Sequence, residues 1–281
     1  MIRILSDSTC DFSPELTEKN NIEIIPLHVY LGEEEYLDGV SINPEKLYEW
    51  SDATGSTPRT SAPTPDEVEH IFKKYIDQGD ELIVFTISSL MSASYNVCKL
   101  AAESLNASDR ILVVDSTNLT TGIGHLMLEA KELIDEGKDL KTIGEEIQKL
   151  KPLLRSSFVV DTLVYLSRGG RCSGLAAMLG SVLKLHPRIV VENGAMHSDK
   201  KYRGSLDKAV LKYAEDLTPA LLKARPKRVF ITHSGCSEEI ISGVKKLLEN
   251  LNHFNEIHVT KTGCVVSSHC GPGTLGILYM D

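Results

Sequence analysis

Short apolar runs alternate with helix-length amphipathic stretches along the first half of the chain. The runs at residues 2–5, 22–27, 82–85 and 111–114 are typical of buried strands, and the second of them could continue to Leu31. Polar residues follow each run, and most of the polar segments lead into stretches with apolar positions every three or four residues, the spacing of an amphipathic helix. Repeated strand–helix units of this kind predict a parallel sheet with helices on both faces.

The pattern changes in the second half of the chain. Residues 189–197 contain a strand that runs into an Asn193-Gly194 turn, which predicts an antiparallel hairpin. Further strands are expected at 229–232, 257–260 and 275–280, with helices between them. We therefore predict an α/β protein with two domains. Residues 1–153 form a three-layer α/β/α domain with a parallel sheet, and residues 154–281 form a two-layer α/β domain with a mixed sheet.

A serine-rich turn connects the strand at 82–85 to the helix that follows it. Ser88, Ser89 and Ser92 lie in this turn, and the helical pattern begins near Tyr95. Free backbone N–H groups and the positive end of the helix dipole meet at such a position, which favours an anion such as a phosphate or a carboxylate. The alternative is that the three hydroxyls only cap the helix.

Other hydroxyl-rich loops follow neighbouring strands. Ser8 and Thr9 come after the first strand, and Ser116 and Thr117 come after the strand at 111–114. A longer loop at residues 51–65 is rich in Ser, Thr, Pro and Gly and is expected to be extended. Ligands of parallel α/β sheets gather beyond the carboxyl ends of the strands. The sequence therefore predicts a polar binding site at this edge.

Three segments of the second half carry residues suited to binding. Residues 264–274 are expected to form a glycine-rich turn that contains His269, where glycines allow close approach of a ligand. Arg203 follows the hairpin, and its planar guanidinium suits a carboxylate. The Gly169-Gly170-Arg171 turn lacks phosphate-loop spacing, and a helix is expected after it at 173–183. A surface-turn histidine and a solvated arginine are the alternatives for the first two.

Composition and motif content argue against several functions. The net charge is -9 with dispersed basic residues, and aromatic residues make up only 6% of the chain, which argues against a nucleic-acid surface. The six cysteines form no C-x-x-C pair, and no metal-site or G-x-S-x-G motif occurs. The first apolar run is too short for a signal peptide, and no run approaches membrane-spanning length. We therefore expect a cytoplasmic protein without a metal.

Seven short motifs are spread over the whole chain in a characteristic order. They are Asp7-Ser8-Thr9, Thr60-Ser61-Ala62-Pro63, residues 88–95, Asp115-Ser116, Gly169-Gly170-Arg171, Tyr202-Arg203 and residues 268–273. Their order and spacing resemble the DegV family of bacterial fatty-acid-binding proteins. The family usually has Ser-Gly-Thr-Tyr where this chain has Ser92-Ala93-Ser94-Tyr95. Because alanine tolerates a positive φ less well than glycine, we expect a slight difference in that loop.

The resemblance implies a binding protein without catalytic residues or cofactor. One long-chain fatty acid would lie buried between the two domains, its carboxylate held by Thr60 and Ser92 with His269 and Arg203 nearby. The resemblance further implies that a cytosolic kinase phosphorylates the bound acid to an acyl phosphate, a phospholipid precursor. Transient membrane contact is compatible with this role. Two sets of further residues are implied: the supporting loop residues Ser61, Ser89 and Ser268, and Arg171 in the region that contacts the kinase.

Two other functions remain open from the sequence. An acyl hydrolase would use Ser92 as nucleophile and His269 as base. A phosphate- or nucleotide-binding regulator would need the Gly169-Gly170-Arg171 turn at its ligand. For the fatty-acid protein, the acid needs a route into a closed tunnel, and the expected helix at 173–183 is our candidate for the element that moves.

Overall fold

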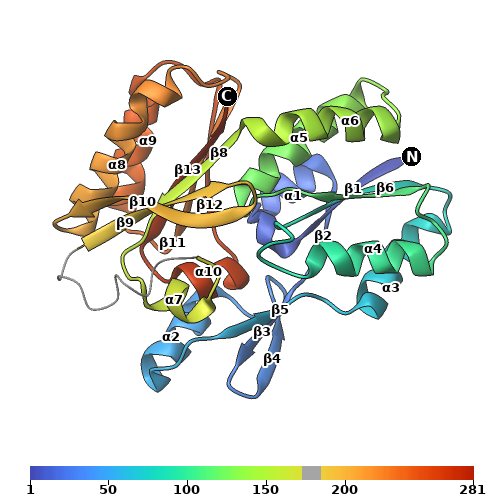
Figure 1. Ribbon diagram of the computed structural model, residues 1–281, viewed down its shortest axis with the longest axis horizontal. Coiled ribbons are helices and arrows are strands. Elements are labelled where there is room, and N and C mark those ends of the chain that lie inside the picture. Colours follow the sequence, from blue (N-terminus) through green and yellow to red (C-terminus); the bar gives the residue numbers. More distant parts are fainter. Residues whose placement is uncertain (173–184) are drawn as a thin grey trace.

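A parallel sheet forms the centre of the first half of the protein, in a computed structural model that describes residues 1–172 and 185–281 (Figure 1). Its strands follow the order β2–β1–β6–β7. The bounds are Ile22–Ile25 for β2, Ile2–Asp7 for β1, Glu81–Thr86 for β6 and Ile111–Asp115 for β7. All three pairings are parallel, as the strand–helix pattern predicts.

Helices cover both faces of this sheet. One face packs against α3 (Pro65–Ile76) and α4 (Ser94–Ser104), and the other packs against α5 (Thr121–Asp135) and α6 (Leu140–Leu150). Neighbouring strand residues divide between the faces: Leu82 packs toward α3 and α4, whereas Ile83 packs toward α5 and α6. Because both faces are buried, the strands are almost continuously apolar. The first half is thus a three-layer α/β/α arrangement, as predicted.

The second half is built on a mixed sheet with the strand order β10–β9–β8–β13–β11–β12. The bounds are Leu154–Val159 for β8, Leu185–Glu192 for β9, Ala195–Arg203 for β10, Arg228–Ser234 for β11, Glu256–Lys261 for β12 and Thr274–Met280 for β13. Only the β11–β12 pair is parallel among these described strands. Helices α8 (Leu206–Leu221) and α9 (Glu238–Asn250) cover the outer face, which confirms the predicted mixed-sheet class.

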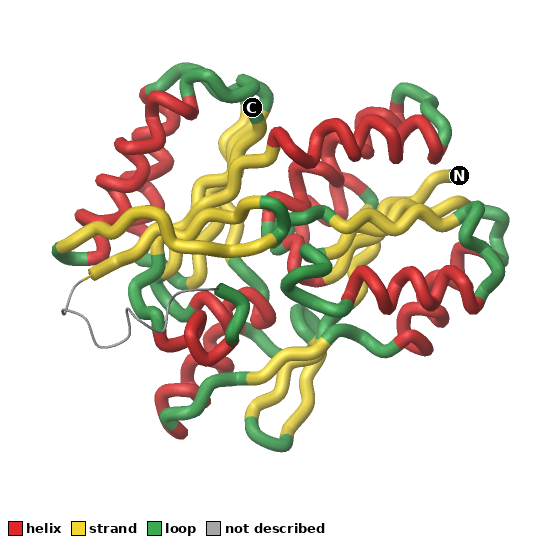
Figure 2. The backbone as a smooth tube through the Cα atoms, in the orientation of Figure 1, coloured by secondary structure: helices red, strands yellow, loops and turns green. Residues whose placement is uncertain are grey.

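A small antiparallel sheet lies at the lower edge of the molecule in Figure 2. Its strands are β4 (Glu34–Leu37), β3 (His28–Leu31) and β5 (Arg59–Ser61), in that order. The predicted strand at 22–27 is present as β2, but it does not continue to Leu31: Pro26 separates β2 from β3, since proline cannot donate a ladder hydrogen bond. Helix α2 (Pro44–Thr54) packs beside this sheet, so the expected 51–65 loop is shorter than predicted.

The small sheet also contacts the second half of the chain. Val29 and Leu47 share an apolar cluster with Cys264 and Val265, which lie on helix α10 (Cys264–Cys270). Strand β8 begins the mixed sheet at Leu154, but these contacts cross the expected division, so the boundary between residues 153 and 154 stays a prediction.

Helix α10 corrects one expectation. The glycine-rich turn predicted at 264–274 is a helix up to Cys270, and only the residues after it form a turn. The N–H groups of Gly263 and Cys264 donate to the carboxylates of Asp11 (2.7 Å) and Asp38 (2.6 Å), both from the first half. These two long-range caps stabilise a helix start that the local sequence does not show.

The remaining described elements are short. They are the 3₁₀ turns Ser8–Cys10 and Lys151–Leu153, α1 (Pro14–Asn20) and α7 (Val164–Gly169). Ser13, Thr64 and Ser237 each accept a backbone N–H at a helix start. The helix expected at 173–183 lies outside the described residues.

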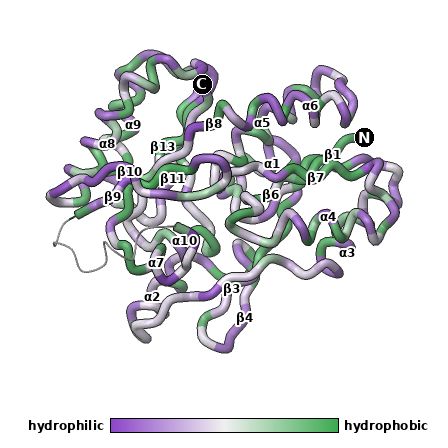
Figure 3. Tube along the Cα trace, viewed as in Figure 1, coloured by the Kyte–Doolittle hydropathy of each residue, from purple (hydrophilic) through white to green (hydrophobic). Residues whose placement is uncertain are grey.

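A continuous apolar cluster joins the two halves. Ile123 and Leu126 of α5 belong to the same cluster as Phe158 of β8 and Ile189 of β9. Figure 3 shows hydrophobic residues concentrated along the central strands of both sheets. The space between the sheets is therefore apolar core, and any cavity within it has contributions from both halves.

Candidate functional site

The hydroxyl-rich loops meet at one edge of the parallel sheet, as predicted. A carboxylate oxygen of Asp7, at the end of β1, accepts the N–H of Ile87 at 2.9 Å. Ser88 donates its N–H to the Asn118 carbonyl at 2.8 Å, and Ser89 donates both its N–H and its hydroxyl to the Asp115 carboxylate. Ser89 therefore holds the loop in shape. Asp7 and Asp115 fix the shape of the serine turn by accepting its N–H and O–H groups. In the sequence, only their position at strand ends points to this role.

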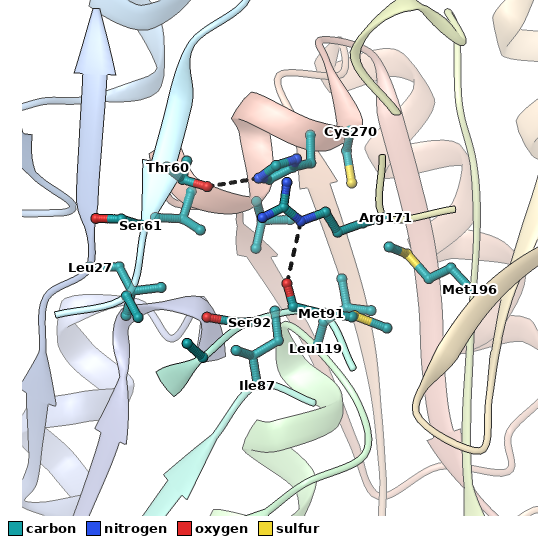
Figure 4. A pocket seen from close by; sticks show the side chains of 15 residues that line it. Leu27, Thr60, Ser61, Ile87, Met91, Ser92, Leu119, Arg171, Met196 and Cys270 are labelled. Atoms are coloured by element: carbon teal, nitrogen blue, oxygen red, sulfur yellow. Dashed lines mark hydrogen bonds between the residues drawn. The ribbon is translucent and has the colours of Figure 1, made fainter. Parts of the chain in front are cut away.

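A cavity of about 260 Å³ lies beside this edge, between the two halves (Figure 4). The first half supplies residues from β5, the serine turn and the segment before α5, and the second half supplies residues from α10, β10 and the segment after α7. Four of the residues proposed from the sequence line it: Thr60, Ser61, Ser92 and His269. Arg171 lines it as well.

Thr60 and His269 are brought together across the two halves. Thr60 Oγ1 lies 2.9 Å from His269 Nε2, and they share a hydrogen bond. Burial, with a smaller contribution from the charge of Arg171, lowers the pKa of His269 to about 4. A Cβ atom on Gly169 would lie 2.3 Å from His269 Nδ1, so α7 ends directly against the ring. The imidazole at this site is therefore neutral at physiological pH.

The serines differ in their surroundings. Ser92 lines the cavity, and its Oγ lies 2.9 Å from Ser94 Oγ. Ser61 lines the mouth and is exposed. Ser268 does not line the cavity, because its hydroxyl donates to the Cys264 carbonyl within α10 at 2.7 Å. Ala93 has a φ of -78°, so the loop needs no positive φ at the position where we expected a difference.

Of the two candidate arginines, the structure brings Arg171 to the cavity and does not bring Arg203 there. Arg171 Nη1 donates to the Gly169 carbonyl at 2.6 Å, and Nε donates to the Met91 carbonyl at 3.4 Å. Arg203 is exposed at the end of β10, pairs in register with Leu185 and does not line the cavity. The sequence could not distinguish them, since both follow a turn.

An apolar wall completes the cavity, and sequence reasoning missed it. Its members include Met91, Leu119, Met196, Val266 and Cys270. Burial raises the pKa of the Cys270 thiol to about 12, so this side chain behaves as a small apolar group at neutral pH. Such residues resemble ordinary core residues in sequence, and only their common cavity marks them.

A second, much smaller cavity of about 20 Å³ adjoins the inner end of the first. Leu119, Val266 and Cys270 line both cavities. The rest of its wall includes several serines and threonines.

Residues 1–172 and 185–281 contain neither a metal-binding cluster nor a helix able to span a membrane. No group of three or more His, Cys, Asp or Glu side chains there is arranged to hold a metal ion. Among the helices of the same residues, none combines the length and the apolar character that crossing a bilayer requires.

The fold and the cavity define a mixed α/β protein with a mainly apolar site between a parallel and a mixed sheet, and with hydroxyls at its mouth. The family profile described as "Uncharacterised protein, DegV family" matches residues 1–281. A DegV domain-containing protein of Clostridium perfringens is 33% identical over 282 residues, which cover 100% of this chain and 98% of the relative. The chain belongs to the DegV family.

Solved structures of similar proteins have the same fold. A DegV family protein of Thermus thermophilus, described by its fatty acid binding, superposes with a TM-score of 0.90 at 28% identity and covers 100% of this chain and 99% of its own. A stearic-acid-binding protein of Eubacterium ventriosum gives a TM-score of 0.87 at 28% identity, with 100% and 98% of the two chains covered.

Proposed function

We propose that this protein binds one long-chain fatty acid in the cavity between its halves and is a carrier without catalytic activity. The observation that carries the proposal is the cavity itself, with an apolar wall from Met91 to Cys270 and polar groups gathered at one end. The similar proteins that bind fatty acids add support.

The energetics suit such a ligand. At about 0.8 kcal/mol for each buried CH₂, a sixteen-carbon chain gains roughly 10 kcal/mol before the entropy costs of binding. A buried carboxylate needs hydrogen-bond donors in compensation. Thr60 and Ser92 offer hydroxyls, and Arg171 offers a guanidinium at the same end of the cavity. His269 contributes as a neutral hydrogen-bonding group and not as a cation.

The hydrolase alternative has less support from the geometry. Within the described part of the chain, His269 bonds to Thr60 and not to Ser92, and its Nδ1 has no partner to orient the ring. A general base works best with a pKa near the working pH, whereas the pKa of His269 is lowered to about 4. A hydroxyl-imidazole pair with these properties suits ligand binding better than nucleophilic attack.

We further propose that the loaded protein presents the fatty acid to a cytosolic kinase, which phosphorylates the carboxylate to an acyl phosphate. The carboxylate end of the cavity lies near the exposed Arg168 and Arg171, two cations available to an acidic partner surface. A cytoplasmic location follows from this role. Incubation of the loaded protein with such a kinase and ATP should yield acyl phosphate, and a lack of product with every kinase of the source organism would contradict this part.

The binding proposal has a direct test. Mass spectrometry of a solvent extract from the purified protein should find one fatty acid per chain. The double variant Thr60→Val/Ser92→Ala should retain less than a tenth of it, because the buried carboxylate loses two donors. Ser268→Ala is the matched control, since its hydroxyl bonds within α10. Wild-type protein that neither carries nor takes up fatty acid would refute the proposal.

A further inference from the structure

The β9–β10 hairpin extends beyond the rest of the mixed sheet toward the first half of the molecule (Figure 1). Strand β9 pairs with β8 from Arg188 to Val191, so among the described strands residues 192–195 pair only with each other. A β-bulge between Ser198 and Lys200 interrupts the β9–β10 pairing further back. Because a bulge bends the strand that contains it, the hairpin has a point at which its direction can change.

The tip of this hairpin contacts the serine turn of the first half. Gly194, in the hairpin turn, is buried, whereas turns usually lie in solvent. Its carbonyl accepts the hydroxyl of Ser88 at 2.6 Å, and a Cβ atom on it would lie 2.8 Å from Ser88 Oγ and 3.5 Å from Leu90 Cδ1. Ser88 is itself fully buried. Its hydroxyl therefore joins the two halves of the protein.

The hairpin also separates the main cavity from a groove of about 820 Å³. Met196 of β10 lines the cavity (Figure 4), and the next residue, His197, lines the groove. Since successive side chains of a strand point to opposite faces, the hairpin is a wall of a single layer at this position. The first half continues the wall in the same way, with Leu119 at the cavity and Asn118 at the groove.

Ser88 bonds to both parts of this wall. Its N–H donates to the Asn118 carbonyl at 2.8 Å, and its hydroxyl donates to the Gly194 carbonyl. The carbonyl of Ser88 accepts the N–H of Ser92 at 3.1 Å, and Ser92 lines the cavity. A side-chain hydrogen bond of Ser88 thus closes the wall where the two halves meet, next to a residue of the binding site.

We propose that the β9–β10 hairpin is a gate between the cavity and the groove, and that the Ser88 hydroxyl keeps this gate closed. The inference rests on the proposed fatty-acid function: the acyl chain enters and leaves through the groove when the hairpin tip moves away from the serine turn. Leu154 and Val190 supply apolar surface along this path. Opening exposes the hydroxyl and the Gly194 carbonyl to water, so it costs only the modest net value of a hydrogen bond between neutral groups. Ser88 is therefore a positioning residue.

Exchange kinetics of the full-length protein test the gate. The protein is loaded with cis-parinaric acid, a fluorescent fatty acid, and its transfer to excess phosphatidylcholine vesicles is followed by stopped flow. In Ser88→Ala the open state should be about tenfold more populated, because the closed state loses a hydrogen bond. Release and uptake should both accelerate about tenfold, which leaves the dissociation constant within about threefold of the wild type. Unchanged rates, or weaker binding with unchanged uptake, would overturn the proposal.

Ser116→Ala is the matched control. Ser116 is also fully buried, and its hydroxyl donates to the Asn118 carbonyl and accepts the Asn118 N–H, both at 3.1 Å and both within the first half. Its release and uptake rates should equal those of the wild type. The same acceleration in Ser116→Ala as in Ser88→Ala would mean that any lost bond in these loops loosens the cavity, and the specific role of Ser88 would be wrong.

A reversible crosslink tests the gate in the opposite direction. A Cβ atom on Gly194 lies within disulfide reach of residue 88, so Ser88→Cys/Gly194→Cys should form a disulfide when treated with diamide. The oxidised variant should release the acid at least about tenfold more slowly than its reduced form, and dithiothreitol should restore the rate. Gly194→Cys alone and the wild type, each treated with diamide, control for strain and for the six native cysteines. Unchanged release from the crosslinked protein would show that the acid passes elsewhere and would overturn the gate.

Hydrogen exchange of the ligand-free protein separates the gate from the proposed function. Amides of residues 189–198 should exchange about tenfold faster in Ser88→Ala than in the wild type, whereas those of β13 should not change. Equal exchange in the two proteins would overturn the role of Ser88, also where the crosslinked variant fails to fold. A failure of every acid to bind would overturn the proposed function and the passage of ligand, and hydrogen exchange would still decide whether Ser88 holds the hairpin.

Discussion

At the scale of single residues, the charge at the mouth of the cavity comes from an unexpected arginine. Arg171 is anchored by two backbone carbonyls, those of Gly169 and Met91, and this anchoring reduces the entropy that its side chain loses when it binds an anion. Arg203 is exposed at the end of a strand and is not among the residues around the cavity. The pair is a natural comparison for any measurement of fatty-acid affinity.

We expect Arg171→Gln to weaken fatty-acid binding by about 10- to 100-fold, the usual effect of a lost hydrogen bond to a charged group. Arg203→Gln should leave the affinity within twofold of the wild type, roughly the effect of removing a distant exposed charge. Isothermal titration with the same acid at the same ionic strength measures both. An equal loss in both variants would contradict the geometry.

The residues of the site were predictable to very different degrees. Thr60, Ser92 and His269 stand in polar segments, the resemblance to the DegV family singled them out, and all three line the cavity. The apolar wall and the choice between the two arginines depend on contacts between residues far apart in the chain. Leu119 and Met196, for example, belong to different halves and meet only in the folded protein.

At the scale of elements, α10 shows why local patterns fail. Residues 264–274 contain β-branched valines, serines and glycines, which are poor helix formers, so a turn was the reasonable expectation. The helix forms because Asp11 and Asp38, more than two hundred residues away in the chain, accept its first N–H groups. The parallel sheet, in contrast, could be predicted because the local sequence shows each strand as an apolar run and each helix as apolar residues spaced three or four apart.

The turn after α7 offers a test of how that element supports the site. Gly169→Ala places a Cβ against His269 Nδ1, so we expect it to displace the ring and reduce fatty-acid affinity by about tenfold or more, the effect of a lost hydrogen bond. Gly170→Ala has no atom near its Cβ but has a φ of +67°. It should lower stability by about 1 kcal/mol without changing the affinity. Thermal unfolding and titration of both variants separate the two effects, and reduced affinity in Gly170→Ala alone would contradict this interpretation.

At the scale of the whole molecule, the halves are joined by more than apolar contacts. His125 of α5 is buried against β13, where its Nε2 donates to the Leu278 carbonyl at 3.1 Å, and its ring packs edge-on against Phe230. A carbonyl can only accept, so this nitrogen carries the proton. Burial lowers the pKa of His125 to about 3, with further lowering by the charge of Arg228.

This histidine should make the protein sensitive to acid. In the unfolded chain the His125 side chain binds a proton near pH 6.5, whereas in the folded protein it does so only near pH 3. The contribution of neutral His125 to the free energy of unfolding is therefore fully present above pH 6.5 and is lost as the pH falls from 6.5 to about 3. At about 1.4 kcal/mol per pH unit, the loss reaches up to about 5 kcal/mol. We expect His125→Gln to flatten the curve of unfolding free energy against pH, measured with urea. A curve as steep as that of the wild type would mean that other groups cause the acid loss.

The predicted boundary after residue 153 also has a test. Residues 1–153 expressed alone lack Cys264 and Val265, which complete the cluster with Val29 and Leu47. They also lack the strands that cover α5. We expect this fragment to show expanded, poorly packed behaviour with exposed apolar surface, measured by dye binding and near-ultraviolet circular dichroism. A cooperative unfolding transition would instead establish the first half as an independent domain.

The position of the 260 Å³ cavity between the two halves has a consequence for how long the protein survives in a cell. A molecule that occupies this cavity binds only the folded chain. At a free concentration about a hundred times its dissociation constant, it raises the free energy of unfolding by about 2.7 kcal/mol. Proteases act mainly on the opened chain, so degradation should slow when lipid is plentiful and quicken when it is scarce. With the proposed fatty acid as this ligand, the amount of the protein should rise and fall with the supply of that acid.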